Sequence, residues 1–326
     1  MKFKIILYSE IKEEVRKELE KKCEVIYIDM DDPKFDEKLA VYLPEIVGIM
    51  GDGLMIDRSI IEAAPQLKVI SNISVGYDNL DIKAINERGI IATNTPDVLT
   101  DTTADLMFAL LMSTARRIGQ LDRYVKNCNW SGNIGFELFG SDIHGKTLGI
   151  IGMGKIGWAI AKRGKFGFNM PILYYNRSRK LKAEKELNAQ FCTLEELLQK
   201  SDFVCLMTPL TEETRYLIGT REFKLMKKSA FFINGSRGHT VDEQALITAL
   251  EKEQIAGAGL DVYQKEPVSK DNPLLKMEHV VTLPHIGSDT HENKLAMDKL
   301  ACENLLEVLK GNKPITAINP EILNQN

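Results

Sequence analysis

Short apolar runs alternate with stretches of helical periodicity over the first hundred residues. Residues at helical spacing fill Ile11–Lys22, Asp57–Ala64 and Ile82–Arg88. Near-continuous apolar strands separated by amphipathic helices are typical of a parallel sheet covered by helices on both faces. The pattern predicts βαβ units that end near residue 99. The expected strands are Phe3–Tyr8, Val25–Ile28, Val47–Met50, Lys68–Ile73 and Ile90–Asn94.

A second alternating series begins at Thr147 and predicts a second doubly wound domain. Val241–Glu253 is its clearest helical pattern. The expected strands are Thr147–Ile151, Pro171–Tyr175, Phe203–Met207, Ala230–Ile233, Gly257–Val262 and Val280–Leu283.

Two long helices and one irregular segment frame this second series. Thr100–Ile118 has helical spacing, and Thr102 with Asp105 resembles a capping box. Gly119–Lys146 is rich in Gly, Asn and Ser, which predicts a surface excursion or an arm that reaches a partner subunit. Thr290–Leu309 is the last expected helix, and the pattern leaves open whether it packs on the first domain.

Composition and charge narrow the class of protein. The chain has 326 residues, 44% hydrophobic and 27% charged, with a net charge of −4. This length exceeds the ~250–300 residues at which one core stops growing, so two domains are expected. The slight acidity argues against a dedicated nucleic-acid binder. No apolar run reaches the ~18 residues of a membrane span or forms a signal peptide, so no membrane partner is expected.

The chain offers few residues for disulfides or metals. Its five cysteines are scattered singly and form no CxxC pair, which predicts a reduced, cytoplasmic protein. No HExxH, clustered His/Cys spacing or Asp-rich loop is present, so no metal site is expected.

A glycine-rich loop is the most specific local motif. It follows an expected strand and opens an expected helix at Trp158–Lys165, the context that dinucleotide binding requires. In such loops the first glycine permits a tight turn, the second lets backbone N–H groups approach a pyrophosphate, and the third allows close helix–strand packing. A tight turn without a ligand is the alternative. The loop is Gly152-Met153-Gly154-Lys155-Ile156-Gly157.

The residues after the next strand predict which dinucleotide binds. NAD sites place an acid there for the ribose 2′-hydroxyl, but this chain has Asn176-Arg177-Ser178-Arg179 and no acid until Glu184. Guanidinium groups bind a 2′-phosphate that a carboxylate would repel. We therefore expect NADP (as NADPH), with NAD as a possible second cofactor. The alternative is a solvated basic turn.

Several residues at expected strand ends are candidates for carbonyl chemistry. Reduction of a 2-keto acid needs a cation for the carboxylate and an acid for the developing alkoxide. Arg237 follows one strand and His285 another, and His239 beside Arg237 competes with His285 as the acid. Glu266 would raise the pKa of a neighbouring imidazole, but spacing does not show that they meet.

Two further positions are candidates for contacting an anionic substrate. Val75 and Gly76 lie in a turn after the strand Lys68–Ile73, where backbone N–H groups can bind an anion. Ser288 lies next to Gly287 at an expected helix start.

Five motifs occur in the order of a known family, and together they resemble the D-isomer-specific 2-hydroxyacid dehydrogenases. The resemblance covers essentially the whole chain. The motifs are Gly152–Gly157, Thr208-Pro209 with Leu210–Thr214, Asn234–Gly238, Gly259–Val262 with Glu266-Pro267, and Pro284–Gly287.

The resemblance implies roles for these residues. Arg237 would orient the substrate, His285 would donate the proton, and Glu266 would partner His285, while the backbone of Val75 and Gly76 would hold the substrate carboxylate. It also implies a cofactor site. That site would be lined by Thr103, Gly152, Met153, Gly154, Lys155, Ile156, Gly157, Asn176, Arg177, Ser178, Thr208, Pro209, Thr214 and Asp261.

The resemblance further implies an α/β protein in which a Rossmann cofactor domain (100–286) is inserted into a flavodoxin-like substrate domain (1–99 and 287–326). It implies a homodimer joined through the cofactor domain. Within the family, the chain looks most like glyoxylate/hydroxypyruvate reductases and 2-ketogluconate reductases.

Two other interpretations remain. A nucleotide-sensing corepressor would be expected to carry long disordered tails, and none is expected after Pro320. A 3-phosphoglycerate dehydrogenase would be expected to carry an acid at the ribose position and, in many cases, a regulatory domain.

Overall fold

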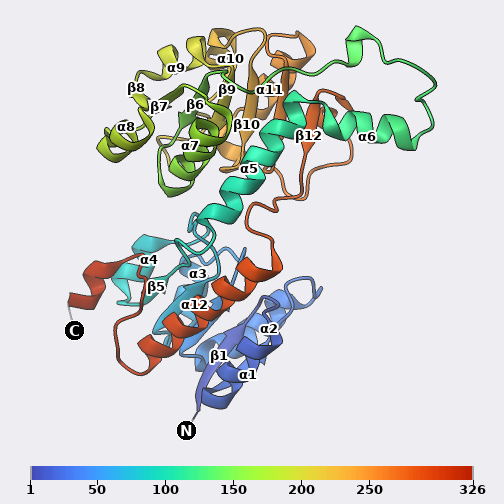
Figure 1. Cartoon of the computed structure of the whole chain (residues 1–326). Helices are drawn as coiled ribbons and strands as arrows, with labels where there is room; N and C mark the ends of the chain where they lie inside the picture. The colour runs from blue at the N-terminus through green and yellow to red at the C-terminus, as the bar shows by residue number, and fades with distance from the viewer. Residues whose placement is uncertain (1, 325–326) are drawn as a thin grey trace. The chain divides into compact units, whose positions relative to one another are not determined.

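A computed structural model describes residues 2–324 as two compact units (Figure 1). The first unit contains the residues up to Leu99 and those from Ser288 on, and the second contains Thr100–Gly287. The second unit is therefore a continuous segment inserted between the two segments that form the first unit. The resemblance placed the second boundary after residue 286, one residue earlier.

The first unit is built on a five-stranded parallel sheet in the order β2-β1-β3-β4-β5. This is the flavodoxin-like strand order that the resemblance implied. Each strand lies within two residues of an expected apolar run. The strands are β1 (Phe3–Leu7), β2 (Cys23–Tyr27), β3 (Gly48–Gly51), β4 (Val69–Asn72) and β5 (Ile91–Thr93).

Helices cover both faces of this sheet. α12 (His291–Leu309) packs against β3, β4 and β5 and against α1 (Glu13–Lys22), which settles the question that the sequence pattern left open. Side chains such as Ile49, Ile70 and Ile61 form a core with the helices of the other face. Those helices are α2 (Phe35–Tyr42), α3 (Arg58–Ala63) and α4 (Ile82–Glu87).

The second unit is built on a seven-stranded parallel sheet in the order β12-β11-β10-β9-β6-β7-β8. Six of its strands match the expected series, which confirms the doubly wound α/β fold class. The strands are β6 (Leu148–Ile151), β7 (Ile172–Tyr175), β8 (Gln190–Phe191), β9 (Phe203–Leu206), β10 (Phe231–Asn234), β11 (Gly257–Leu260) and β12 (Val280–Thr282).

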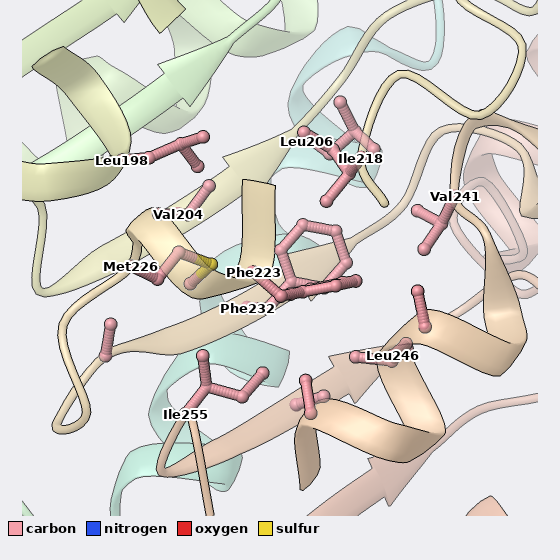
Figure 2. Packing of buried hydrophobic residues seen from close by; sticks show 14 of the residues in the cluster. Leu198, Val204, Leu206, Ile218, Phe223, Met226, Phe232, Val241, Leu246 and Ile255 are labelled. Carbon is pink, nitrogen blue, oxygen red and sulfur yellow. The ribbon is translucent and has the colours of Figure 1, made fainter. Parts of the chain in front are cut away.

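Two hydrophobic cores lie on the two faces of this sheet. On one face, α5 (Thr100–Ala115), α7 (Lys155–Phe168) and α8 (Leu181–Leu187) bury residues including Phe108 and Tyr174. On the other face, α9 (Leu194–Lys200), α10 (Thr220–Leu225) and α11 (Glu243–Glu251) close over Phe232. Figure 2 shows the rings of Phe223 and Phe232 at the centre of this second core, packed edge to face.

The region before β6 differs from its prediction. The long helix ends at Ala115, because Arg117 adopts a left-handed backbone (φ +55°) and a separate helix, α6 (Ile118–Lys126), begins after it. The capping-box prediction is wrong, since the helix already begins at Thr100 and Asp105 instead pairs with Arg163.

The Gly119–Lys146 segment is also more regular than predicted. It contains most of α6 and a short 3-10 turn, Phe136–Leu138, although large parts of it are exposed. The helices α2, α8, α9 and α10 and the strand β8 were not predicted individually. Most of them have fewer than eight residues, too short for a clear period.

No helix within residues 2–324 is long and apolar enough to cross a membrane.

Candidate active site

Most of the predicted site residues of the second unit follow the carboxyl ends of its strands. The strand order reverses beside β6, so the loops after β6 and β9 diverge at this point. In open α/β sheets, ligands bind at such a reversal, outside the carboxyl ends of the strands. The glycine-rich loop follows β6, Thr208 follows β9, and Arg237, Asp261 and His285 follow β10, β11 and β12.

The glycine-rich loop has backbone requirements that explain its first and third glycines. Gly152 has a φ of +98°, and a Cβ there would lie 2.7 Å from the backbone of Met207. A Cβ on Gly157 would lie 2.3 Å from the carbonyl oxygen of Gly152. Side chains at these two positions would collide with backbone, so both glycines are needed for the turn itself.

The middle glycine differs from its neighbours. A Cβ on Gly154 would meet no atom of the described residues within 4 Å. Gly154 is the N-cap of α7, so Lys155, Ile156 and Gly157 form the first turn of that helix. The free N–H groups and partial positive charge of a helix N-terminus favour a phosphate. Met153 beside Gly154 is buried and anchors the loop in the core.

The loop after β9 carries a buried hydroxyl that has no partner within residues 2–324. This group is Oγ1 of Thr208, and buried polar atoms are normally hydrogen-bonded. The adjacent turn is held by Thr214, whose hydroxyl donates to the Pro209 carbonyl oxygen at 2.6 Å and accepts the Thr211 N–H at 2.8 Å. An unpaired hydroxyl at the edge of the glycine-rich loop fits a site that a dinucleotide completes.

The turn after β7 contains the three residues expected at the ribose. The side-chain amide of Asn176 donates to the Ser178 carbonyl oxygen at 3.0 Å, which closes the turn. Arg177 and Ser178 are exposed. The pKa of Glu213 is lowered, chiefly by the hydrogen bond from Thr211 and in smaller part by the positive charge of Arg177. Arg177 therefore lies near the loop after β9.

His285 and Glu266 meet, although the sequence could not show it. The Nδ1 atom of His285 lies 2.7 Å from Oε2 of Glu266, and the other carboxylate oxygen accepts the backbone N–H of Tyr263 at 2.9 Å. His285 has a φ of +54°, a left-handed conformation that non-glycine residues rarely adopt and that clusters at functional sites. The His285 side chain is 44% exposed, so its ring remains accessible.

The pair shifts both pKa values. The hydrogen bond to Glu266 raises the pKa of His285, against the opposing effects of burial and of the Arg237 charge. Burial raises the pKa of Glu266, but the hydrogen bonds from His285 and Tyr263 and the charges of His285 and Arg237 together hold it below its usual value. The carboxylate thus stabilises the protonated imidazole.

Arg237 lies close to this pair. A Cβ on Gly238 would lie 1.8 Å from the Tyr263 carbonyl oxygen, so the Arg237 loop packs directly against the segment that leads to Glu266. The half-buried guanidinium donates to the Ser236 carbonyl oxygen at 2.9 Å. Its charge acts on the pKa values of both Glu266 and His285. The cation and the imidazole are therefore neighbours.

His239, the competing candidate, lies in a different environment. Its ring packs against that of Tyr216, with 6.3 Å between the ring centroids. No carboxylate of residues 2–324 pairs with it. The geometry favours His285 as the acid.

Asp261 and Thr103 support the His285 segment. Asp261 is 1% exposed, and its carboxylate accepts the Ile286 N–H at 2.9 Å, one residue after His285. Burial raises the pKa of Asp261. A Cβ on Gly287 would lie 3.2 Å from the Asp261 carboxylate and 3.5 Å from the methyl of Thr103. Sequence reasoning missed Tyr263, because a backbone donor leaves no signal in the residue type.

Val75, Gly76 and Ser288 belong to the first unit, and its structure shows what fixes the turn after β4. The carbonyl oxygens of Val75 and Gly76 accept side-chain amides of Asn94 and Asn72, at 2.9 and 2.8 Å. Within residues 2–324, no acceptor takes their own N–H groups. Two free, fixed N–H groups suit an anion. Ser288 accepts the Asn293 amide through its carbonyl oxygen.

Residues 2–324 contain no group of three or more His, Cys, Asp or Glu side chains arranged to hold a metal ion. With the glycine-rich loop and the His285–Glu266 pair, the second unit has the features of a dinucleotide-dependent oxidoreductase.

Comparisons with known proteins give the family. The profile described as "D-isomer specific 2-hydroxyacid dehydrogenase, NAD binding domain" matches residues 108–287. The glyoxylate/hydroxypyruvate reductase B of Enterobacter sp. (strain 638) is 47% identical over 322 residues, 99% of each chain. That of Escherichia coli (strain SMS-3-5) is 46% identical over the same length. The chain belongs to the D-isomer-specific 2-hydroxyacid dehydrogenases.

Solved structures agree with this assignment. A protein from Thermus thermophilus superposes with a TM-score of 0.89 at 38% identity, over 97% of this chain and 100% of that chain. An NADPH-dependent glyoxylate/hydroxypyruvate reductase from Sinorhizobium meliloti, in complex with NADP and malonate, has a TM-score of 0.87 at 31% identity. That match covers 98% of this chain and 97% of the other. This chain is thus an oxidoreductase with a nicotinamide dinucleotide cofactor.

Proposed function

We propose that this protein reduces a small 2-keto acid, glyoxylate or hydroxypyruvate, to the D-2-hydroxy acid with NADPH. The observation that carries the proposal is the 2.7 Å contact between His285 and Glu266, with the Arg237 loop packed against the same segment. The relatives named glyoxylate/hydroxypyruvate reductase B match over 99% of the chain and support this choice of substrate. 2-Ketogluconate belongs in the same test as a larger substrate.

Each charged group has one task in the proposed reaction. Arg237 binds the substrate carboxylate with its planar fork and polarises the carbonyl group. The protonated His285 donates its Nε2 proton to the carbonyl oxygen, and Glu266 stabilises the imidazolium until that transfer. In the first unit, we propose that the N–H groups of Val75 and Gly76 form an anion site suited to a carboxylate. The glycine-rich loop and Thr208 would hold NADPH, which when bound would supply the hydride for the carbonyl carbon.

The preference for NADPH is supported by the turn after β7. Arg177 and Ser178 are exposed there, next to the loop that carries Thr208. No carboxylate stands among residues 176–183. An arginine and a hydroxyl offer donors to a 2′-phosphate, whereas the ribose of NADH lacks the acidic partner that it usually has.

A substrate panel tests the proposed function. We expect NADPH oxidation with glyoxylate and hydroxypyruvate, and a kcat/KM for NADPH at least ~10-fold above that for NADH, because ~1.4 kcal/mol of 2′-phosphate binding gives this factor. Pyruvate and 2-ketogluconate complete the panel. No oxidation with any of the four acids would refute the reductase assignment, and a higher kcat/KM with NADH would refute the cofactor preference.

We propose a homodimer formed through the second unit. The proposal is supported by the aromatic side chains that the 119–146 segment leaves in solvent. Phe136 is 87% exposed, Trp130 65% and Phe139 53%, and such exposed groups mark interaction surfaces. Light scattering after size-exclusion chromatography should give twice the chain mass of 36.7 kDa, and a monomer for the F136S/F139S variant. A monomeric parent protein would exclude the dimer.

A further inference from the structure

A hydrogen-bonded brace closes the turn that is proposed to read the 2′-phosphate. The Tyr174 hydroxyl, at the end of β7, donates to Oε1 of Glu184 at 2.6 Å and accepts the backbone N–H of Lys180 at 2.7 Å. Tyr174 is fully buried in the hydrophobic core between the seven-stranded sheet and α5, α7 and α8, so these hydrogen bonds are anchored in that core. The brace ties the strand end to α8 and encloses residues 176–179.

The same carboxylate holds one of the two arginines of the turn. Arg179 donates from Nε to Oε1 of Glu184 at 3.0 Å and from Nη2 to Oε2, a two-point contact. Among residues 2–324, Arg177 makes no such contact with Glu184, and its charge instead lowers the pKa of Glu213 in the loop after β9. The two arginines thus have different tasks although they lie two residues apart in the chain.

We propose that Glu184 is a positioning residue for 2′-phosphate recognition, an inference that rests on the proposed use of NADPH. Glu184 binds Arg179 and fixes the turn, so that Arg177 presents its guanidinium to the 2′-phosphate. A turn that is already ordered loses less conformational entropy when it binds a phosphate. An acid in this region would ordinarily repel a 2′-phosphate. Glu184 is compatible with one, because both of its oxygens are already occupied by Tyr174 and Arg179.

Two measurements on the full-length protein test this proposal. The first is KM and kcat for NADPH and for NADH with glyoxylate. The second is calorimetric affinity for adenosine 2′,5′-bisphosphate and for adenosine 5′-monophosphate, which differ only in the 2′-phosphate. E184A should raise the KM for NADPH and weaken the bisphosphate by about 5- to 10-fold, the net scale of one ordinary hydrogen bond. The kcat, the KM for NADH and the monophosphate affinity should stay unchanged.

Other variants separate positioning from charge. E186A removes an exposed acid of the same helix that takes no part in the brace, so it changes net charge equally and should leave both affinities unchanged. Y174F keeps the buried ring but removes the hydroxyl, and should weaken the bisphosphate in the same direction as E184A. R177A should weaken bisphosphate binding by at least about 10-fold, because Arg177 contacts the phosphate. R179A should have a smaller effect than R177A, because it removes a partner of Glu184 and no contact with the phosphate.

Three results would overturn the inference: an unchanged bisphosphate affinity in E184A, a tighter one because freed Arg179 now binds the phosphate, or equal losses in R177A and R179A. A parent protein that binds bisphosphate and monophosphate equally would instead refute the NADPH preference, and the inference with it. Reduction of glyoxylate with NADH would still stand in that case.

Discussion

His285 and Glu266 form a hydrogen-bonded pair, with 2.7 Å between Nδ1 of the imidazole and Oε2 of the carboxylate. The contact leaves Nε2 as the nitrogen that can act on a substrate, because Nδ1 is already engaged. The carboxylate raises the pKa of His285, so the protonated form persists to a higher pH than for a free histidine. This is the state that a proton donor needs at the start of carbonyl reduction.

The reduction rate should depend on pH in a direction set by this pair. Reduction requires the imidazolium, so kcat/KM for glyoxylate should be high below the raised pKa of His285 and fall as the pH rises through it. E266Q removes the main cause of the raised pKa. Its falling limb should therefore move to lower pH, and its kcat should drop by about 10- to 100-fold. Steady-state rates from about pH 5 to 9 measure both.

A pH profile of E266Q that coincides with that of the parent protein would show that Glu266 does not set the pKa of the proton donor. The sign also matters: a limb that moves to higher pH in E266Q would contradict the assignment of the imidazolium as the reactive form.

Removal of the imidazole tests the choice between the two candidate histidines. H285A should lower kcat by about 10²- to 10⁴-fold, the usual contribution of a positioned acid–base group. H239A is the matched control, because His239 packs on Tyr216 and should leave kcat within about threefold of the parent value. Single-turnover rates with NADPH and glyoxylate give the comparison. Full activity in H285A, or loss of activity in H239A alone, would reverse the assignment.

The sequence predicted best those strands and helices that are long enough to show a clear hydrophobic pattern. Strands β1 and β6 were predicted to within one residue at each end, because buried parallel strands are continuous apolar runs bounded by polar residues. Helix ends were harder to predict. Thr102 and Asp105 have the residue types of a capping box, yet both lie inside a helix that begins at Thr100, and Asp105 pairs with Arg163 on α7.

The site also contains one part that the sequence predicts and one part that it does not. The glycine-rich loop was predictable because each glycine answers a local requirement, a positive φ at Gly152 or a close approach at Gly157. The meeting of Glu266 with His285 was not, since 19 residues and one strand separate them and no local pattern fixes their distance. Only the resemblance to a family paired them.

Arg237 should be required for substrate binding because of its shape as well as its charge. R237K keeps one positive charge but loses the planar fork that matches a carboxylate. We expect the KM for glyoxylate to rise by about 10- to 100-fold in R237K and further in R237A, with the KM for NADPH nearly unchanged. Initial rates at saturating NADPH measure this. Equal KM values for glyoxylate in R237A and the parent protein would remove Arg237 from the site.

Substitutions of two glycines in the loop should affect different properties, one the stability of the fold and the other the binding of the cofactor. In G157A the new methyl group would lie 2.3 Å from the Gly152 carbonyl oxygen, so helix and strand must move apart. Such overpacking costs about 1–3 kcal/mol and should lower the Tm by roughly 2–10 °C.

G154A should behave in the opposite way. Its methyl group meets no atom of the described residues within 4 Å, and its φ of −82° suits alanine. The Tm should therefore stay within about 2 °C of the parent value, since the substitution adds no strain to the fold. The methyl group would instead occupy the space above the first turn of α7, so the Kd for NADPH should rise at least ~10-fold, a cost of ~1.4 kcal/mol. Scanning calorimetry without cofactor and fluorescence titration with NADPH give the two values. A G154A protein that binds NADPH normally would show that the phosphates do not approach the chain at this glycine. The phosphate-binding position would then have to be assigned elsewhere along the same edge of the sheet.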